Sequence, residues 1–348
     1  MVKEVAVAPP GSVTVSVWLT VAGCPMRETI TRDVTRAVGA VAGVTEVHVE
    51  LDVMSDTQRR KLQEQVRGGA PVNEIPFAQP GSLTRVYAVA SGKGGVGKSS
   101  VTVNVAVALA ERGLSVGVVD ADIYGHSVPR MFGVTGRPTQ VEQMIMPPQA
   151  YGVRVISIGM FTAGNAAVVW RGPMLHRALQ QFLADVFWGD LDVLLLDLPP
   201  GTGDIAISVA QLVPSAELLV VTTPQMAAQE VAERAGSIAL QTHQHIVGVV
   251  ENMSWLETPD GGRMELFGSG GGAAVAESLT RATGARVPLI GQIPIDVRLR
   301  EGGDDGRPIV ITDPETPAAA ALRQVADALG SKQRGLAGRP LGLTPIRH

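Results

Sequence analysis

The stretch Gly92-Lys93-Gly94-Gly95-Val96-Gly97-Lys98-Ser99-Ser100 decides the fold of this chain. It follows the apolar run VYAVAS and precedes VTVNVAVALAERG, which has a helical composition. Residues 92–99 fit the spacing G-x-x-x-x-G-K-[ST], in which glycines let the backbone wrap so that successive N–H groups point at phosphate oxygens. The N-terminus of the following helix adds partial positive charge. The stretch therefore predicts a phosphate-binding loop between a strand and a helix.

The residue types within this loop predict separate roles. Lys98 is expected to reach the β- and γ-phosphates of ATP, and Ser99 to ligate Mg²⁺. The alternative is a glycine-rich turn with no ligand, which the agreement of spacing, strand and helix disfavours. The backbone that would cradle the nucleotide is that of Gly92, Lys93, Gly94, Gly95, Val96, Gly97, Lys98 and Ser99.

Two further apolar runs end in carboxylates. VVDADIYGHS carries Asp120 and Asp122, and DVLLLDLPPGTGD carries Asp197 and Gly201. The carboxyl ends of parallel strands face the ligand crevice. Asp197 is therefore predicted to hold Mg²⁺ through water, Asp120 to order the loop or the magnesium shell, and Gly201 to offer its N–H to the γ-phosphate. The alternative is that these acids only cap helices.

The pattern outside the loop predicts an α/β fold. Short apolar runs alternate with helical stretches, which indicates a mostly parallel sheet covered by helices on both faces, as in a P-loop NTPase. The runs are VYAVAS, SVGVVDAD, DVLLLDLPP, AELLVVTTP, HIVGVVEN and PLIGQIP. This ATPase domain is expected to span residues 85–330, after a linker at 69–84 rich in Gly and Pro. The tail, residues 331–348, is expected to be disordered.

A small α+β domain is predicted at residues 1–68. Residues 13–21 alternate like a strand, 28–41 have helical spacing, and 44–53 indicate a second strand. A polar-faced helix is expected to follow, with Ser55 as its N-cap.

Composition limits the class of protein. The 348 residues are 45% hydrophobic, with 29 basic and 33 acidic side chains and a net charge of −4, which argues against a general nucleic-acid binder. The single cysteine, Cys24, allows no disulfide within the chain and favours a reducing compartment. No signal-peptide pattern and no apolar run of about 18 residues occurs, so a cytoplasmic protein with no membrane partner is expected.

Lys93, the second residue of the glycine-rich loop, indicates a particular group of P-loop ATPases. GKGGVGKS resembles the deviant Walker A loop of MinD, ParA and the nitrogenase iron protein. The resemblance implies a homodimer in which Lys93 reaches the partner's phosphates; the alternative is a solvated loop lysine. It also implies that Asp122 helps position the attacking water. At the nucleoside end it places Asn252, Pro294 and Asp296 around the adenine, although each of these three also has a purely structural interpretation.

Within that group the chain most resembles the Mrp/ApbC family of iron–sulfur cluster carriers. The resemblance implies ATP hydrolysis, a [4Fe–4S] cluster as cargo and apo iron–sulfur proteins as acceptors. The N-terminal segments LTVAGCPMRETITRDV and VMSDTQRRKLQ resemble the small iron–sulfur-assembly domain often fused ahead of it. The acidic segment with which that domain usually begins is not matched, so either the domain is truncated or its start lies upstream. The matching segments are VVDADIYGHSVPRMFG, VVWRGPMLHRALQQFL, DLPPGTGDIAISVAQ, TTPQMAAQEVAERA, VVENMSW and ELFGSGGG.

One departure bears directly on function. The family's Cys-x-x-Cys pair, which binds the cluster across the dimer, aligns with Thr258 and Gly261, and neither supplies a thiolate. Clusters are held by four cysteine thiolates as a rule, and one Cys24 per chain gives two per dimer. Cys24 itself is a candidate cluster ligand because it stands at a helix start, where thiolates are favoured; a small buried cysteine is the equal alternative.

Two functions remain open from the sequence. The first is an ATP-hydrolysing iron–sulfur carrier or assembly factor, which the Mrp-type motifs favour. The second is a nucleotide-switched scaffold or positioning ATPase of the MinD/ParA type that holds no cluster, which the missing cysteine pair favours.

Overall fold

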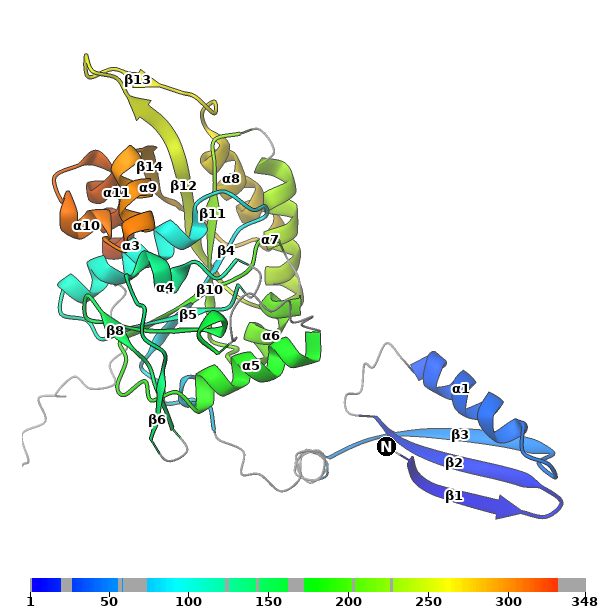
Figure 1. Ribbon diagram of the computed structural model, residues 1–348. Helices are drawn as coiled ribbons and strands as arrows, with labels where there is room; N and C mark the ends of the chain where they lie inside the picture. The colour runs from blue at the N-terminus through cyan, green and yellow to red at the C-terminus, as the bar shows by residue number, and fades with distance from the viewer. Residues whose placement is uncertain are drawn as a thin grey trace, which may run out of the picture. The chain divides into compact units, whose positions relative to one another are not determined.

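The chain forms two compact units, Met1–Asn73 and Glu74–His348 (Figure 1). The computed structural model describes residues 2–19, 27–55, 58, 74–122, 125–141, 144–161, 172–201, 204–225 and 228–330. Cys24, most of the helix predicted after Ser55, and the tail 331–348 lie outside these residues. Each unit has its own hydrophobic core and is described by itself.

The first unit is a three-stranded sheet with one helix. β1 (Val2–Ala8) pairs antiparallel with β2 (Ser12–Leu19), and β2 pairs parallel with β3 (Glu46–Val53). Helix α1 (Arg27–Gly39) lies in the connection from β2 to β3. Alternation along β2 buries Val13, Val15 and Val17, and side chains of α1 pack against them. The sequence predicted β2, α1 and β3 but not β1, whose seven residues are all exposed.

The second unit is built on a nine-stranded sheet. Its strands are β4 (Arg85–Ala90), β5 (Val116–Asp120), β8 (Gln149–Ala150), β9 (Val153–Ser157), β10 (Val193–Asp197), β11 (Glu217–Thr222), β12 (Ile246–Glu257), β13 (Arg263–Met264) and β14 (Leu289–Ile295). The order is β13-β12-β11-β4-β10-β5-β9-β8, with β14 paired to β12. Only the short strands β8 and β13 pair antiparallel. A separate antiparallel pair joins β6 (Thr139–Val141) and β7 (Met144–Met146).

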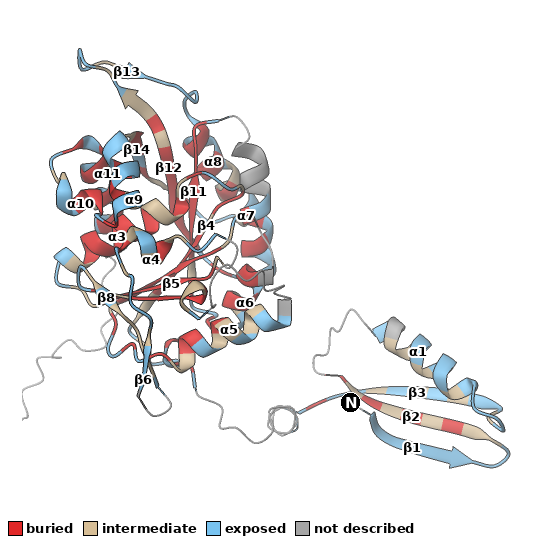
Figure 2. Cartoon of the chain, in the orientation of Figure 1, coloured by how far each residue is buried: buried red, intermediate tan, exposed pale blue. Residues whose placement is uncertain are grey.

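Helices cover both faces of this sheet because its strands are apolar on both sides. The strands β4, β5, β10 and β11 are buried along most of their length (Figure 2). Along β4, Val86 and Ala88 enter one core and Tyr87 and Val89 the other. The first core is covered by α5 (Gly172–Ala184), α6 (Asp204–Leu212), α7 (Ala228–Thr242) and α8 (Gly271–Thr283). The second is covered by α3 (Lys98–Glu111), α4 (Val128–Met131), α9 (Val297–Asp305), α10 (Ile309–Thr312) and α11 (Pro317–Gly330).

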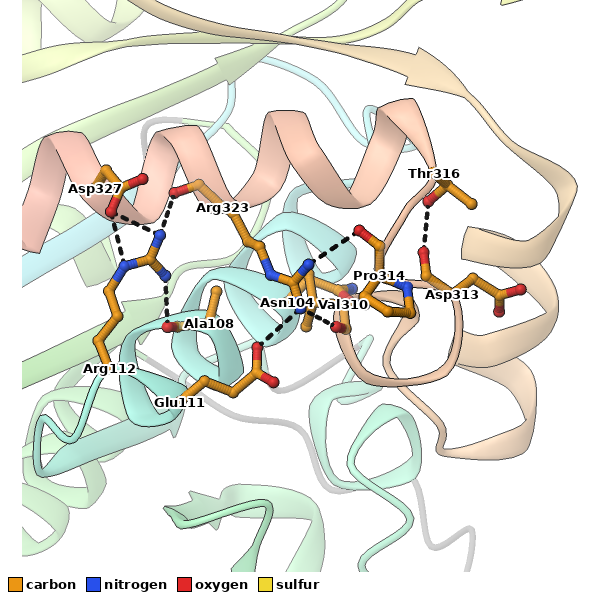
Figure 3. Close-up of polar contacts among 10 residues, drawn as sticks. All are labelled: Asn104, Ala108, Glu111, Arg112, Val310, Asp313, Pro314, Thr316, Arg323 and Asp327. Carbon is orange, nitrogen blue, oxygen red and sulfur yellow. Dashed lines mark hydrogen bonds and ion pairs between the residues drawn. The ribbon is translucent and has the colours of Figure 1, made fainter.

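The helix that follows the glycine-rich loop is held firmly against the C-terminal helix. The Arg112 guanidinium donates to Asp327 at 2.7 Å, and Arg323 donates to the Val310 carbonyl at 2.7 Å and to Glu111 at 3.3 Å (Figure 3). Asn104 accepts the Val310 N–H at 3.4 Å. These bonds fix α3, and with it the loop at its N-terminus, against α10 and α11.

The chain enters the second unit through the short turn η1 (Pro76–Ala78). Ile75 and Phe77 are buried there, and the Phe77 ring meets Trp188 edge-on at 6.5 Å. The sequence placed these residues in a linker, but the side chains of Ile75 and Phe77 belong to the core that α5 also covers. A second turn, η2 (Ile158–Met160), follows β9.

Candidate functional site

The loop between β4 and α3 has the backbone conformation that wrapping around phosphate requires. Gly95 and Gly97 have φ of 78° and 79°, in the left-handed region that glycine enters without strain. Gly97 is the N-cap of α3, and a Cβ there would overlap the side-chain amide nitrogen of Asn252. Position 97 therefore requires glycine for its backbone angle and for its packing.

Side chains from the first turn of α3 converge on the carboxylate that ends β10. Asp197 is fully buried, and its Oδ2 lies 2.6 Å from Ser99 Oγ and 2.8 Å from Lys98 Nζ. Its Oδ1 accepts a hydrogen bond from Thr102 Oγ1 at 2.8 Å. The structure thus brings together Lys98, Ser99 and Asp197 as the sequence predicts, and adds Thr102.

Lys98 has unused hydrogen-bonding capacity. Its ammonium is buried and forms an ion pair with Asp197 Oδ2 at 2.8 Å, and no hydrogen bond of Nζ is found among the described residues. An ammonium has three N–H donors, and a buried one without hydrogen bonds is costly, so a further anion would stabilise it. The glycine conformations, this ammonium, and a hydroxyl beside a carboxylate fit a Mg²⁺–nucleotide phosphate group.

Asp120 is the neighbour of Asp197 in the sheet. The register of β5 and β10 pairs the two residues directly. Burial, and then the Asp197 charge, raise the pKa of Asp120 well above its usual value. Its carboxyl accepts the Asp122 N–H at 3.1 Å and the Ser157 hydroxyl at 3.1 Å. Asp120 therefore orders the backbone at Asp122, one of the two roles that the sequence allowed.

Asp122 and Gly201 lie beside this network with local partners. Asp122 Oδ1 accepts the Gly125 N–H at 2.9 Å, which turns the carboxylate toward its own loop. The Gly201 N–H donates to the Ser91 carbonyl at 2.9 Å, so in this conformation it is already engaged. The predicted γ-phosphate contact of Gly201 would need this bond to open.

Lys93 points toward the loop after β11. Its ammonium donates to Gln225 Oε1, and Gln225 is exposed. Arg234 of α7 donates to the Gly92 carbonyl at 3.1 Å.

Three residues of the site, Thr102, Gln225 and Arg234, were not predicted from the sequence. Only Thr102 carried a signal, because it stands one helical turn after Lys98 and Ser99 and so shares their face of α3.

The residues predicted around the base have structural partners. Asn252 is buried and donates to the Val96 carbonyl at 2.9 Å, so it braces the glycine-rich loop from β12. Asp296 is the N-cap of α9, accepts the Arg298 N–H at 2.9 Å and pairs with the Arg298 guanidinium at 2.8 Å. Pro294 is buried in β14. Contact of these residues with a base stays a prediction.

The positions aligned with the cysteine pair form a turn. The end of β12 forms an antiparallel hairpin with β13 (Figure 1). At its tip the Gly261 N–H donates to the Thr258 carbonyl at 2.8 Å, and a hydrogen bond with the Thr258 hydroxyl lowers the pKa of Asp260. No thiolate is present, so this turn does not fit a [4Fe–4S] cluster. Among the described residues, no group of three or more His, Cys, Asp or Glu could hold a metal ion.

The part of the chain that the structure describes contains no helix with the length and apolar character needed to cross a membrane.

Two sequence families match the chain. Residues 82–330 match a family described as NUBPL iron-transfer P-loop NTPase, and residues 1–49 match one described as iron–sulfur cluster assembly protein. The iron-sulfur cluster carrier protein of Mycobacterium tuberculosis is 67% identical over 348 residues, which is 100% of this chain and 91% of that protein. The carrier protein of Synechocystis is 40% identical over 340 residues, 95% of this chain and 90% of that protein.

Solved structures share the fold of the second unit. A nucleotide-binding protein from Archaeoglobus fulgidus in complex with ADP is 36% identical with a TM-score of 0.56, over 67% of this chain and 89% of that one. The septum site-determining protein MinD of Pyrococcus horikoshii, complexed with Mg-ADP, is 25% identical with a TM-score of 0.51, over 73% of this chain and 98% of that one.

Proposed function

Because the chain belongs to the NUBPL iron-transfer P-loop NTPase family, we propose that it binds and hydrolyses ATP and carries iron–sulfur clusters to apoproteins. The observation that carries the nucleotide part is the buried Lys98 ammonium, with no hydrogen-bond partner among the described residues, beside Ser99 and Asp197. The similarity to proteins named iron-sulfur cluster carriers, at 67% identity over the whole chain, supports the cargo.

Nucleotide binding would change the partner of Lys98. In this structure its ammonium faces Asp197; phosphate oxygens at the N-terminus of α3 would offer it the hydrogen bonds that it lacks. Ser99 Oγ would hold Mg²⁺ directly and Asp197 through water, and the cation when bound neutralises charge on the phosphates. The Ser99 hydroxyl proton already points to Asp197 Oδ2 at 2.6 Å, which leaves its lone pairs free to act as ligands. Asp122 would orient the attacking water after leaving Gly125.

The working form is proposed to be a homodimer. The resemblance of GKGGVGKS to deviant Walker A loops supports the placement of Lys93 against the partner's phosphates. In the separate chain the Lys93 ammonium is occupied by Gln225, so dimerisation would exchange that amide for a phosphate. The phosphate is the stronger acceptor because it is charged.

The hairpin of β12 and β13 supplies no ligand for a cluster, so other residues must bind the cluster as cargo. Thr258 and Gly261 provide no thiolate, and Cys24 is the single cysteine in the sequence. We propose that the Cys24 thiolates of two subunits contribute ligands while the cluster is in transit. The same observation favours a second candidate, a nucleotide-switched scaffold of the MinD/ParA type that holds no cluster.

One experiment separates the two candidates. The purified chain is reconstituted anaerobically with iron and sulfide, and an apo iron–sulfur protein is then added. A carrier is expected to take up a cluster, seen by its visible absorbance, and to activate the acceptor. Lys98→Ala should still fold, but it should lose nucleotide binding and any effect of ATP on transfer, because the charge partner of the phosphates is gone.

The matched variant for the cargo is Cys24→Ser. It should keep ATP turnover and lose cluster uptake. Wild-type protein that turns over ATP but takes up no cluster would leave the scaffold as the function. Wild-type turnover in Lys98→Ala would instead remove the nucleotide site from residues 92–99.

A further inference from the structure

The carboxylate of Asp197 is oriented by a residue that lies outside the phosphate-binding motif. Thr102 is 1% exposed and lies in the stretch of α3 from Val101 to Leu109, which is buried on all sides. Its hydroxyl lies 2.8 Å from Asp197 Oδ1 and 3.0 Å from the Lys98 carbonyl. A hydroxyl has one proton to donate, and a carboxylate is a stronger acceptor than a carbonyl, so the bond to Asp197 prevails.

This bond determines which carboxylate oxygen faces the nucleotide. The terminal torsion of an aspartate is soft, so its two oxygens exchange places unless something fixes them. Thr102 takes Oδ1, and Oδ2 is left beside Ser99 Oγ at 2.6 Å and Lys98 Nζ at 2.8 Å. The two hydroxyls therefore fix the carboxylate from both ends.

We propose that Thr102 is a positioning residue for the nucleotide-bound cation: it fixes the Asp197 carboxylate so that Oδ2 faces the Mg²⁺ site at Ser99. This inference rests on the proposed nucleotide-binding function and deepens it. Thr102 touches neither nucleotide nor cation. It acts through Asp197, and its loss should weaken the binding of Mg²⁺ with nucleotide rather than that of the nucleotide alone.

A purely structural role gives a different expectation. A buried hydroxyl between α3 and β10 also ties a helix to a strand, and removing it would lower stability in every condition. Thr102→Val keeps the shape and removes the hydroxyl, whereas Thr102→Ser keeps the hydroxyl and removes the methyl. Thr242→Val is the matched control. Its hydroxyl contacts the Ile238 carbonyl at 2.7 Å and Gln244 Oε1 at 3.1 Å. Thr242 ends α7, just before the N-terminal end of β12, whereas the site lies at the C-terminal ends of the strands.

The test measures binding of the fluorescent nucleotide N-methylanthraniloyl-ADP to the full chain, in EDTA and across a Mg²⁺ titration. Thermal unfolding without nucleotide is recorded for each variant. In Thr102→Val, the Mg²⁺ concentration for half-maximal tightening of binding should rise about 10- to 100-fold, as is typical when a partner of a metal-ligand group is lost. Affinity in EDTA should change little. Thr102→Ser should stay within about 3-fold of wild type, and Thr242→Val should not shift the Mg²⁺ requirement.

Several results would overturn the proposal. An unchanged Mg²⁺ requirement in folded Thr102→Val, an equal shift in Thr242→Val, or an equal loss of affinity in EDTA would each assign Thr102 to the fold alone. If Thr102→Val does not fold, Thr102→Ala against Thr102→Ser repeats the comparison. Wild-type protein with no Mg²⁺-dependent binding would remove the proposed function as well, which separates that failure from the failure of Thr102 alone.

Discussion

At the scale of single residues, Tyr87 links strand β4 to the end of helix α11. It is fully buried in β4, and its hydroxyl donates to the Leu329 carbonyl at 3.1 Å. Arg85 donates to the carbonyls of Leu329 and Gly330 from the same strand. Together they satisfy carbonyls at the C-terminus of α11, which a helix leaves without partners.

Burial of this tyrosine predicts a loss of stability in alkali. Burial raises the pKa of Tyr87 to about 12, against about 10 in the unfolded chain. The folded state therefore holds the proton more tightly. Its contribution is complete below pH 10 and declines as the pH rises from 10 to 12. Over that window the free energy of unfolding of wild type should fall by up to about 2–3 kcal/mol more than that of Tyr87→Phe.

Urea unfolding between pH 8 and pH 12 measures this difference. Tyr151→Phe is the control, because the Tyr151 hydroxyl also donates to a carbonyl, that of Gly306 at 2.9 Å, but Tyr151 is 38% exposed. Parallel pH profiles for wild type and Tyr87→Phe would show that this proton is not linked to folding.

The sequence predicted the polar residues of the site only where a motif fixes their spacing. Lys98, Ser99 and Asp197 meet because the glycine-rich loop and Asp197 both lie at the carboxyl ends of neighbouring parallel strands, at one edge of the sheet. Gln225 and Arg234 meet residues 92–93 through tertiary packing of the β11–α7 region, and no local pattern encodes that meeting. The hydrogen bonds of Asp120 to Asp122 and Ser157 likewise depend on strand register.

At the scale of elements, strand β12 contacts the glycine-rich loop and supports it. Asn252 donates to the Val96 carbonyl, and its amide occupies the space that a Cβ on Gly97 would need. Met253, next in the strand, has φ of 59°, and the pairing of β12 with β14 shifts register after Asn252. The strand is therefore irregular at Asn252 and Met253, where it contacts the loop, and it continues from there into the hairpin with β13.

This contact predicts that Gly97→Ala disrupts the loop more than Gly95→Ala does. Both glycines have nearly the same left-handed φ, 79° and 78°, so the backbone strain of an alanine, about 1–2 kcal/mol, is common to both. Only at Gly97 does the added methyl meet Asn252; at Gly95 nothing lies within 4 Å. Overpacking costs about 1–3 kcal/mol more, so ADP affinity should fall about 10-fold further in Gly97→Ala.

Titration of ADP by calorimetry tests the comparison. Adding Asn252→Ala to Gly97→Ala should restore part of the affinity, because it removes the overlapping amide. Equal losses at the two glycines would mean that the backbone angle alone controls the loop and that β12 does not support it.

Elements were predictable where the apolar pattern is strong. Each of the six apolar runs, from VYAVAS to PLIGQIP, is a strand, because strands buried on both faces are apolar throughout. The pattern missed β1, which buries no side chain, and the pair β6–β7, whose strands have three residues each. It also missed β9, where Arg154 interrupts the apolar run. It also ended β12 at Asn252, whereas the strand runs to Glu257, because a projecting hairpin needs no continuous apolar run.

At the scale of the whole molecule, the proposed homodimer depends on Lys93. It belongs to the phosphate-binding loop, yet its ammonium is turned to Gln225 of its own chain. If Lys93 acts on a partner's phosphates, Lys93→Ala should bind nucleotide through the rest of its loop but lose ATP-dependent dimerisation and most turnover. Sedimentation with ATP and a phosphate-release assay measure the two losses separately.

Gln225→Ala is the control for a role within one chain. It frees the Lys93 ammonium without removing it. If the bond between Lys93 and Gln225 were the whole function of the lysine, Gln225→Ala would reproduce the defect of Lys93→Ala. On the dimer hypothesis it should keep turnover, since only a competitor for the ammonium has been removed.

Mixing two inactive variants gives the directional test. In a mixed dimer of Lys93→Ala and Lys98→Ala, the Lys93→Ala chain has an intact site of its own and receives Lys93 from its partner. One site of that dimer should therefore work, whereas neither variant alone has a working site. Each mixed dimer has one working site of two, so turnover should recover to at most about half of wild type. If turnover does not recover although crosslinking demonstrates mixed dimers, Lys93 acts in the site of its own chain. ATP hydrolysis would then need no partner subunit.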